Sequence, residues 1–203
     1  MKTNDLYSYE KELRQQGISL LCGIDEAGRG PLAGPVCAAA CILPPKLVIE
    51  GLNDSKKLSE KRREALYRQI TDQALAWAVC LVDEKTIDEI NILQATFRAM
   101  RGAVAQLDLT PELCLVDGNR DPGLGLPTRT VVKGDASCAS VAAASILAKV
   151  TRDRLMVQYD AQYPGYGFAV HKGYGTKAHY AAIEELGLCP IHRRSFLKNH
   201  GPA

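Results

Sequence analysis

Long apolar runs are missing from this sequence of 203 residues. None approaches the ~20 residues that a membrane-spanning helix needs. Residues 1–16 are polar and charged and lack the apolar core of a signal peptide. The seven cysteines include no CxxC pair and no zinc-ligand spacing, and most of them stand inside apolar stretches. We therefore expect a cytoplasmic protein whose cysteines are reduced and packed in the core.

A strong charge of either sign is also lacking, since the formal net charge is only +2. Bulk charge therefore says little about partners. Basic residues are instead gathered in four short runs, at 56–63, 149–154, 172–177 and 193–198. Internal repeats, low-complexity stretches and linkers are absent, and a content of 46% apolar residues suffices for one core. We expect a single domain over residues 1–203.

Strand-like and helical patterns alternate along the chain. Five apolar, strand-like runs cover residues 20–25, 36–43, 77–82, 113–116 and 129–132. Helical patterns cover about 60–74, 87–107 and 138–159, and a last helix is expected between a Thr176 cap and Gly187. The segment 28–35, rich in glycine and proline, predicts a turn that joins the first two strands as an antiparallel pair. Together these patterns predict an α/β fold with a central mixed sheet flanked by helices.

Acidic residues follow three of the strand-like runs: Asp25, Asp117 and Asp135. If these strands are neighbours that end on the same side of one sheet, the three carboxylates converge, and Glu26 adds a fourth. Converging carboxylates repel each other, and bound divalent cations relieve that repulsion while forming the clamp that phosphoryl transfer uses. Taken singly, an aspartate at a strand end is more commonly a turn initiator.

Asp25 and Glu26 are consecutive, and consecutive residues of a regular strand point to opposite faces. Both side chains therefore cannot aim at one metal ion while the strand stays regular. Two explanations stay open. Either the strand breaks here, as Gly28 and Gly30 would permit, or Glu26 contributes through its carbonyl group or a bound water.

Other polar residues are weaker candidates. Asp153 is a fifth acid, but its position in mid-helix beside Arg152 and Arg154 favours a structural ion pair. The four histidines lack zinc spacing, and we expect them at the surface or against a duplex: His171, His179, His192 and His200. The glycine spacing of residues 28–34 does not match the GxGxxG nucleotide fingerprint.

Seven segments, in order along nearly the whole chain, resemble the bacterial ribonuclease HII family, a type 2 ribonuclease H. They are GIDEAGRGPLAGP at 23–35, NDSKKL at 53–58, VDGN at 116–119, VKGD at 132–135, SVAAASILAKVTRD at 140–153, HKGYGT at 171–176 and HRRSF at 192–196. The resemblance implies a ribonuclease H-like fold, with a five-stranded mixed sheet in a catalytic core at about 18–160 and a C-terminal, helical, substrate-binding extension at about 161–200.

The resemblance also implies the chemistry. The enzyme would cut the RNA strand of RNA/DNA hybrids and nick 5′ of single ribonucleotides in duplex DNA, leaving 5′-phosphate and 3′-hydroxyl ends. The family's four acidic active-site residues, which hold two Mg²⁺ or Mn²⁺ ions, match Asp25, Glu26, Asp117 and Asp135. One ion would activate the attacking water, and the other would stabilise the leaving oxygen.

Recognition must depend on the ribose, because only the 2′-hydroxyl marks a misplaced ribonucleotide. In the family, the segment matching Gly28, Arg29 and Gly30 contacts the 2′-hydroxyl region, and the tyrosine matching Tyr174 stacks on the sugar beyond the junction. Phosphate contacts are expected from five basic side chains: Lys56, Lys57, Lys172, Arg193 and Arg194.

Two alternatives stay open. One is another metal-dependent nuclease of the same fold, because a fold alone does not fix the substrate. The other is a hybrid-binding module without catalysis. We expect a monomer, and the sequence contains no clear clamp-binding motif.

Overall fold

The computed structural model describes residues 6–197. Its centre is a five-stranded mixed sheet in the order β3-β2-β1-β4-β5. Strands β1 (Leu21–Ala27), β2 (Val36–Ile42) and β3 (Ala76–Val82) are antiparallel neighbours. Strands β4 (Leu113–Asp117) and β5 (Thr128–Val131) continue the sheet in parallel on the other side of β1. The predicted α/β architecture and the antiparallel first pair are confirmed.

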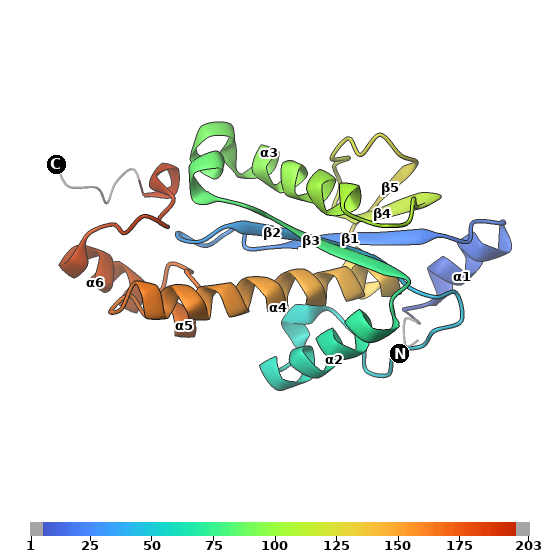
Figure 1. Cartoon of the computed structure of the whole chain (residues 1–203), viewed down its shortest axis with the longest axis horizontal. Helices are drawn as coiled ribbons and strands as arrows, with labels where there is room; N and C mark the ends of the chain where they lie inside the picture. Colours follow the sequence, from blue (N-terminus) through green and yellow to red (C-terminus); the bar gives the residue numbers. More distant parts are fainter. Residues whose placement is uncertain (1–5, 198–203) are drawn as a thin grey trace.

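Helices cover both faces of the sheet (Figure 1). Helix α3 (Glu84–Ala105) lies on one face, and α4 (Ala139–Gln162) lies on the other with α2 (Glu60–Gln73) beside it. The short helix α1 (Ser8–Gln15) lies at one end, and α5 (Phe168–His171) and α6 (Lys177–Leu186) lie at the opposite end. The described part of the chain also contains three 3-10 turns: η1 (Ser55–Lys57), η2 (Gly134–Ala136) and η3 (Arg194–Phe196). None of the described helices is both long and apolar enough to span a membrane.

Alternation along β1 divides its side chains between the two helical layers. Cys22 and Ile24 pack in the cluster that contains the α3 residues, whereas Leu21 packs with Val141 of α4. Helix α4 approaches β1 very closely at Gly23, where an added Cβ would lie only 2.0 Å from the Ser140 carbonyl carbon. The Ala- and Ser-rich first half of α4 therefore permits the close packing that its composition predicts.

Helix α3 is interrupted at Asn91, whose φ of 68° and ψ of 163° are not helical. Its side-chain oxygen accepts hydrogen bonds from the amides of Leu93 and Gln94, so Asn91 starts a second helical segment. The continuous helical pattern at 87–107 did not predict this break.

The C-terminal extension docks on the β1–β2 connection, residues 28–35. The amide of Leu32 donates to the carbonyl of Gly173 at 2.8 Å, and the amide of Arg193 donates to the carbonyl of Leu32 at 2.8 Å. A short antiparallel bridge pairs Ala33 with His192. The connection between the first two strands is therefore held from outside the sheet by residues 170–193.

Candidate active site

Asp25 and Asp117 occupy neighbouring positions on one face of the sheet. Strands β1 and β4 are parallel with Ile24 opposite Val116, so the next residue of each strand is an aspartate. Both side chains belong to the face covered by α4, because residues two or four positions earlier, Leu115 and Leu21, pack against that helix. The predicted convergence of these two acids is thus a consequence of strand register.

Glu26 belongs to the opposite face. It lines a groove of about 320 Å³ with Thr96 and Phe97 of α3 and with Asp117. Its Oε1 lies 3.3 Å from a guanidinium nitrogen of Arg29. Strand β1 remains regular as far as Ala27, so the explanation that the strand breaks between the two acids is wrong.

Asp135 lies in η2, between β5 and α4. This short turn brings its carboxylate near Asp117, since the amide of neighbouring Gly134 donates to Asp117 Oδ1 at 2.7 Å. The exposed side chain of Lys56 reaches the same place, with its Nζ 4.0 Å from Asp135 Oδ2. The fourth acid and one of the predicted basic contacts therefore adjoin the aspartate pair.

The electrostatics of the site disfavour negative charge. Burial, and then the charges of Glu26 and Asp117, raise the pKa of Asp25 well above its usual range. Burial likewise raises the pKa of Glu26 and of Asp135. Burial alone would lower the pKa of Lys56, but the charges of the surrounding carboxylates, Asp25 first, raise it. A cation bound among these acids would be strongly stabilised.

Carboxylate oxygens are the ligands that Mg²⁺ and Mn²⁺ prefer, so the donor set fits these ions. Within residues 6–197, no three His, Cys, Asp or Glu side chains already form a metal-binding group. Each acid instead contacts a donor or cation of the protein. Asp25 Oδ1 accepts from the Glu26 amide at 2.7 Å, while Glu26 and Asp135 contact Arg29 and Lys56.

The predicted ribose-reading segment directly follows β1. Gly28 has a φ of +90°, which a residue with a side chain rarely adopts. An added Cβ at Gly30 would lie 3.7 Å from a ring carbon of Tyr174, and the tyrosine itself is 44% exposed. The structure therefore places the two elements expected to read the sugar, one from each end of the chain, against each other.

The basic side chains expected to bind phosphate have different surroundings. Arg194 is exposed in η3, where Asp88 of α3 accepts from its amide at 2.9 Å. The ammonium group of Lys172 donates to the carbonyl of Ala169. Arg193, in contrast, is completely buried: its guanidinium hydrogen bonds all end on backbone carbonyls, and its Cζ lies 5.2 Å from the centre of the Phe196 ring. Its side chain is not available to a phosphate, because the extension packs over it.

Sequence reasoning missed two polar residues next to the acids. Ser145 of α4 lowers the pKa of Asp25 by hydrogen bonding, and its hydroxyl lies 2.8 Å from that of Ser55. Asp54 caps η1 and is close enough to raise the pKa of Asp135. Asp54 and Ser55 lie inside the NDSKKL segment, so that segment was the available signal.

Asp153 forms the structural ion pair that was predicted, but with other partners. Its Oδ1 lies 2.6 Å from Lys149 Nζ, and its Oδ2 lies 4.0 Å from Arg63. The side chain of Arg152 points away, toward the β1–β2 connection.

Of the three histidines that the structure describes, two are buried rather than at the surface, contrary to expectation, and His171 is half-buried. His179 and His192 are buried with their Nε2 atoms 3.1 Å apart, and the rings of His171 and His179 stack at 4.4 Å. Because the hydrophobic cluster of the extension surrounds Phe168, these rings pack against an aromatic core. His200 lies outside the described residues.

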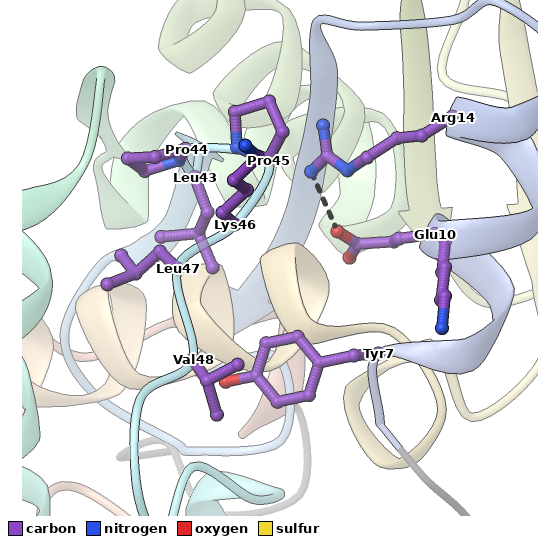
Figure 2. A pocket seen from close by; sticks show the side chains of 10 residues that line it. Tyr7, Glu10, Arg14, Leu43, Pro44, Pro45, Lys46, Leu47 and Val48 are labelled. Carbon is purple, nitrogen blue, oxygen red and sulfur yellow. Dashed lines mark hydrogen bonds and ion pairs between the residues drawn. The ribbon is translucent and has the colours of Figure 1, made fainter.

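A second hollow lies between α1 and the loop after β2 (Figure 2) and shares no residue with the acidic site. Tyr7, Glu10 and Arg14 line it from α1 and the residue before that helix. Glu10 serves the fold here, because its carboxylate accepts from the amide and hydroxyl of Ser140 at the start of α4, and Arg14 lies 3.4 Å away.

The fold and the acids at the strand ends define a class, the ribonucleases H. The structure matches the crystal structure of ribonuclease H2 from Pyrococcus horikoshii with a TM-score of 0.74 and 30% identity, covering 87% of this chain and 93% of that chain. Its fold is also that of Bst-RNase HIII in complex with Mn²⁺, at a TM-score of 0.64 and 21% identity over 86% of this chain and 65% of that chain.

Sequence comparison gives the family. The model named Ribonuclease HII matches residues 22–199. The chain is 57% identical over 201 residues to the ribonuclease HII of Geobacter sp. strain M21, covering 98% of this chain and 87% of the relative. It is 55% identical over 194 residues to that of Ruminiclostridium cellulolyticum, covering 96% and 76%. The chain belongs to the ribonuclease HII family and is a metal-dependent ribonuclease H, an endonuclease that acts on RNA/DNA hybrids.

Proposed function

We propose that this enzyme nicks duplex DNA on the 5′ side of a single embedded ribonucleotide, besides cutting the RNA strand of hybrids. The products would carry 5′-phosphate and 3′-hydroxyl ends. The observation that carries the proposal is the position of Tyr174 opposite Gly30, where an added Cβ would lie 3.7 Å from the tyrosine ring. This arrangement brings a backbone able to approach one sugar near an aromatic ring able to stack on the next.

Asp25, Glu26, Asp117 and Asp135 would hold two Mg²⁺ or Mn²⁺ ions in this proposal. When bound, such a pair supplies an activated water and a charge that stabilises the leaving 3′ oxygen. Asp25 and Asp117 share one face and would supply carboxylates to the ions from neighbouring strands. Glu26, on the other face of a regular strand, would contribute through its carbonyl group or a bound water.

The chain's own residues would orient the substrate. Gly28, Arg29 and Gly30 bring the backbone to the 2′-hydroxyl without a side chain in the way. Tyr174 stacks on the neighbouring deoxyribose and so favours DNA on that side. Lys56 and Arg194 contact phosphates, and the half-buried Lys172 is a third candidate for this role. The proposed working form is a monomer.

The experiment that tests this function uses three duplexes of one sequence: all-DNA, one with a single ribonucleotide, and a full RNA/DNA hybrid. We expect Mg²⁺- or Mn²⁺-dependent nicking 5′ of the single ribonucleotide and no cutting of the all-DNA duplex. The Asp25→Asn variant should lose at least a hundredfold of the rate, because a metal ligand is removed. It should retain its fold and its affinity for the duplex.

Two results would contradict the proposal. Cutting of the hybrid without nicking at the single ribonucleotide would restrict the enzyme to long RNA strands. Equal nicking of the all-DNA duplex would indicate a nuclease that does not read the ribose. An unfolded Asp25→Asn protein would show instead that Asp25 is needed for packing.

A further inference from the structure

Two buried arginines hold the ribose-reading segment from behind. Arg193 lies in the C-terminal extension and donates to the carbonyls of Gly28 at 2.6 Å, Arg29 at 2.9 Å, and Gly34 at 2.7 and 2.9 Å. Arg152 of α4 donates to the carbonyls of Ala33 and Pro35, each at 3.0 Å. These guanidinium contacts reach both ends of the β1–β2 connection.

Arg152 also joins the two halves of the proposed reading site. Its remaining donor contacts the carbonyl of Lys172 at 2.9 Å, two residues before Tyr174. An added Cβ at Gly28 would lie 2.0 Å from Arg152 Nε, so the glycine and the guanidinium are in direct contact. One side chain thus fixes the glycine segment and the tyrosine segment relative to each other.

Their environment is unusual for arginine. Arg152 and Arg193 are 1% and 0% exposed. Among residues 6–197 neither has a carboxylate at ion-pair distance. From farther away the charges of Asp153 and Glu84 act on Arg152, and those of Glu84 and Asp88 act on Arg193, which the charge of Arg152 opposes. Burying a guanidinium without an adjacent counter-ion is costly, so its contacts must compensate. Every hydrogen bond of these two side chains is donated to a backbone carbonyl. The acceptors lie in the β1–β2 connection, residues 28–35, and at Lys172.

The carbonyl directions determine where the amides point. In a trans peptide, the N–H group points opposite to the preceding C=O group, and the described residues contain no cis peptide. Because the carbonyls of Gly28 and Arg29 point inward to Arg193, the amides of Arg29 and Gly30 point outward. Outward amides are the donors that a 2′-hydroxyl oxygen can accept from, and the guanidinium charge behind each peptide polarises it further.

We propose that Arg152 and Arg193 are positioning residues for ribose discrimination: they orient the peptides of the Gly28–Gly30 segment so that its amides meet the 2′-hydroxyl. The inference rests on the proposed function, because it explains how that site distinguishes a ribonucleotide from a deoxyribonucleotide. A lysine retains the charge at either position, but it lacks the planar fork that reaches several carbonyls at once.

The test measures the preference for a duplex with one ribonucleotide over an all-DNA duplex. A loss of folded protein does not change this preference. On the Asp25→Asn background, where the substrate is not cut, the dissociation constants are measured for an all-DNA duplex and for the same duplex with one ribonucleotide. Their ratio cancels the folded fraction. Arg193→Lys and Arg152→Lys should each lower this preference for the ribonucleotide by about tenfold, because misplaced donors lose the hydroxyl contact. Affinity for the all-DNA duplex should stay within twofold of the background.

Arg98→Lys is the matched control, since Arg98 is exposed on α3 and should leave the ratio unchanged. An unchanged ratio in both folded Lys variants would overturn the inference while leaving the proposed function intact. Failure of both variants to fold would also overturn it, since the arginines would then be general supports of the domain. A parent enzyme that neither prefers nor nicks the ribonucleotide duplex would refute the proposed function itself.

Discussion

Lys56 is an exposed cation beside the acidic site, next to Asp135. The side chain is 76% exposed and its Nζ lies 4.0 Å from Asp135 Oδ2. Its amide is fixed by Asp54, which caps η1 at 2.9 Å, so the backbone below the flexible chain is well anchored. A lysine in this place can contact a phosphate that approaches the acids, while partly offsetting their mutual repulsion.

Replacing Lys56 with alanine should therefore weaken duplex binding and reduce its dependence on salt. Loss of one phosphate contact lowers the slope of log affinity against log salt by about 0.9 for duplex DNA. The measurement is a salt titration of duplex binding by fluorescence anisotropy. Lys46→Ala serves as the control, because Lys46 is exposed beside the second hollow. Equal slopes for Lys56→Ala and the parent would argue against a phosphate contact.

The contrast between Arg193 and Arg194 shows the limit of prediction from single residues. The two are adjacent in a basic run, and both were predicted to bind phosphate. The structure exposes Arg194 and completely buries Arg193. The two residues have the same charge and adjacent positions, so their difference in exposure comes only from the docking of the extension on residues 28–35. Sequence patterns contain no information on that docking.

At the scale of elements, strands were easier to predict than the details of helices. Apolar runs bounded by turn residues located all five strands, and Ser59 and Thr176 were confirmed as caps of α2 and α6. Helix α1 was missed, because its segment was read only as polar and charged. Its single fully buried apolar side chain, Leu13, gives little periodic signal.

The histidine cluster of the extension is an element whose protonation state follows from its contacts. The Cys189 amide donates to His192 Nδ1 at 2.9 Å, so the hydrogen of His192 is on Nε2, facing His179 Nε2 at 3.1 Å. The remaining nitrogen of His179, Nδ1, then donates to the carbonyl of Tyr174 at 3.0 Å. This chain is complete only when both rings are neutral. An added proton on His179 Nε2 would face the N–H of His192, and one on His192 Nδ1 would face the N–H of Cys189.

Acid should therefore destabilise the extension. Burial lowers the pKa of His179 to about 4 from an ordinary 6.5. The folded state favours the neutral ring, so this contribution is complete above pH 6.5 and is lost as the pH falls toward 4. It amounts to at most about 3 kcal/mol.

Urea unfolding at several pH values would measure this effect, with His179→Gln as the comparison. The difference in free energy of unfolding between the parent and His179→Gln should shrink as the pH falls from 6.5 to 4. Carboxyl groups with raised pKa values have the opposite effect, because they stabilise the fold as the pH falls. They are present in both proteins, so their contribution cancels in this difference. A difference that stays constant with pH would contradict a neutral buried histidine.

At the scale of the whole molecule, the active site depends on segments that only the complete fold brings together. The acids come from β1, β4 and η2, the basic residues proposed to bind phosphate from η1 and the extension, and the tyrosine proposed to stack on a sugar from the loop before α6. Strand ends predicted the acids, because register and the parallel pairing of β1 with β4 decide their neighbourhood. The position of Tyr174 opposite Gly30 could be expected only through the family resemblance.

The last prediction concerns how this gathering of acids affects stability. Asp25 is buried and its pKa is raised, first by burial and then by Glu26 and Asp117. A carboxyl group with a raised pKa contributes stability at low pH that is lost as the pH rises through that pKa. At neutral pH without metal, the buried Asp25 carboxyl therefore destabilises the fold, because the unfolded state ionises this group more readily.

Binding of Mn²⁺ and the substitution Asp25→Asn should each relieve this cost. Their stabilising effects should not add. Mn²⁺ at a hundred times its dissociation constant should stabilise the parent by about 2.7 kcal/mol, because it binds only the folded state. For a chain of this size that corresponds to a rise in Tm of about 5–10 °C. The variant Asp25→Asn should be more stable than the metal-free parent at pH 7 by on the order of 1 kcal/mol, and Mn²⁺ should raise its Tm much less. Thermal unfolding of both proteins in EDTA and in Mn²⁺ gives all four values. An Asp25→Asn protein less stable than the metal-free parent would show that Asp25 is not a strained buried carboxylate. An equal gain in stability from Mn²⁺ would show that Asp25 is not a metal ligand.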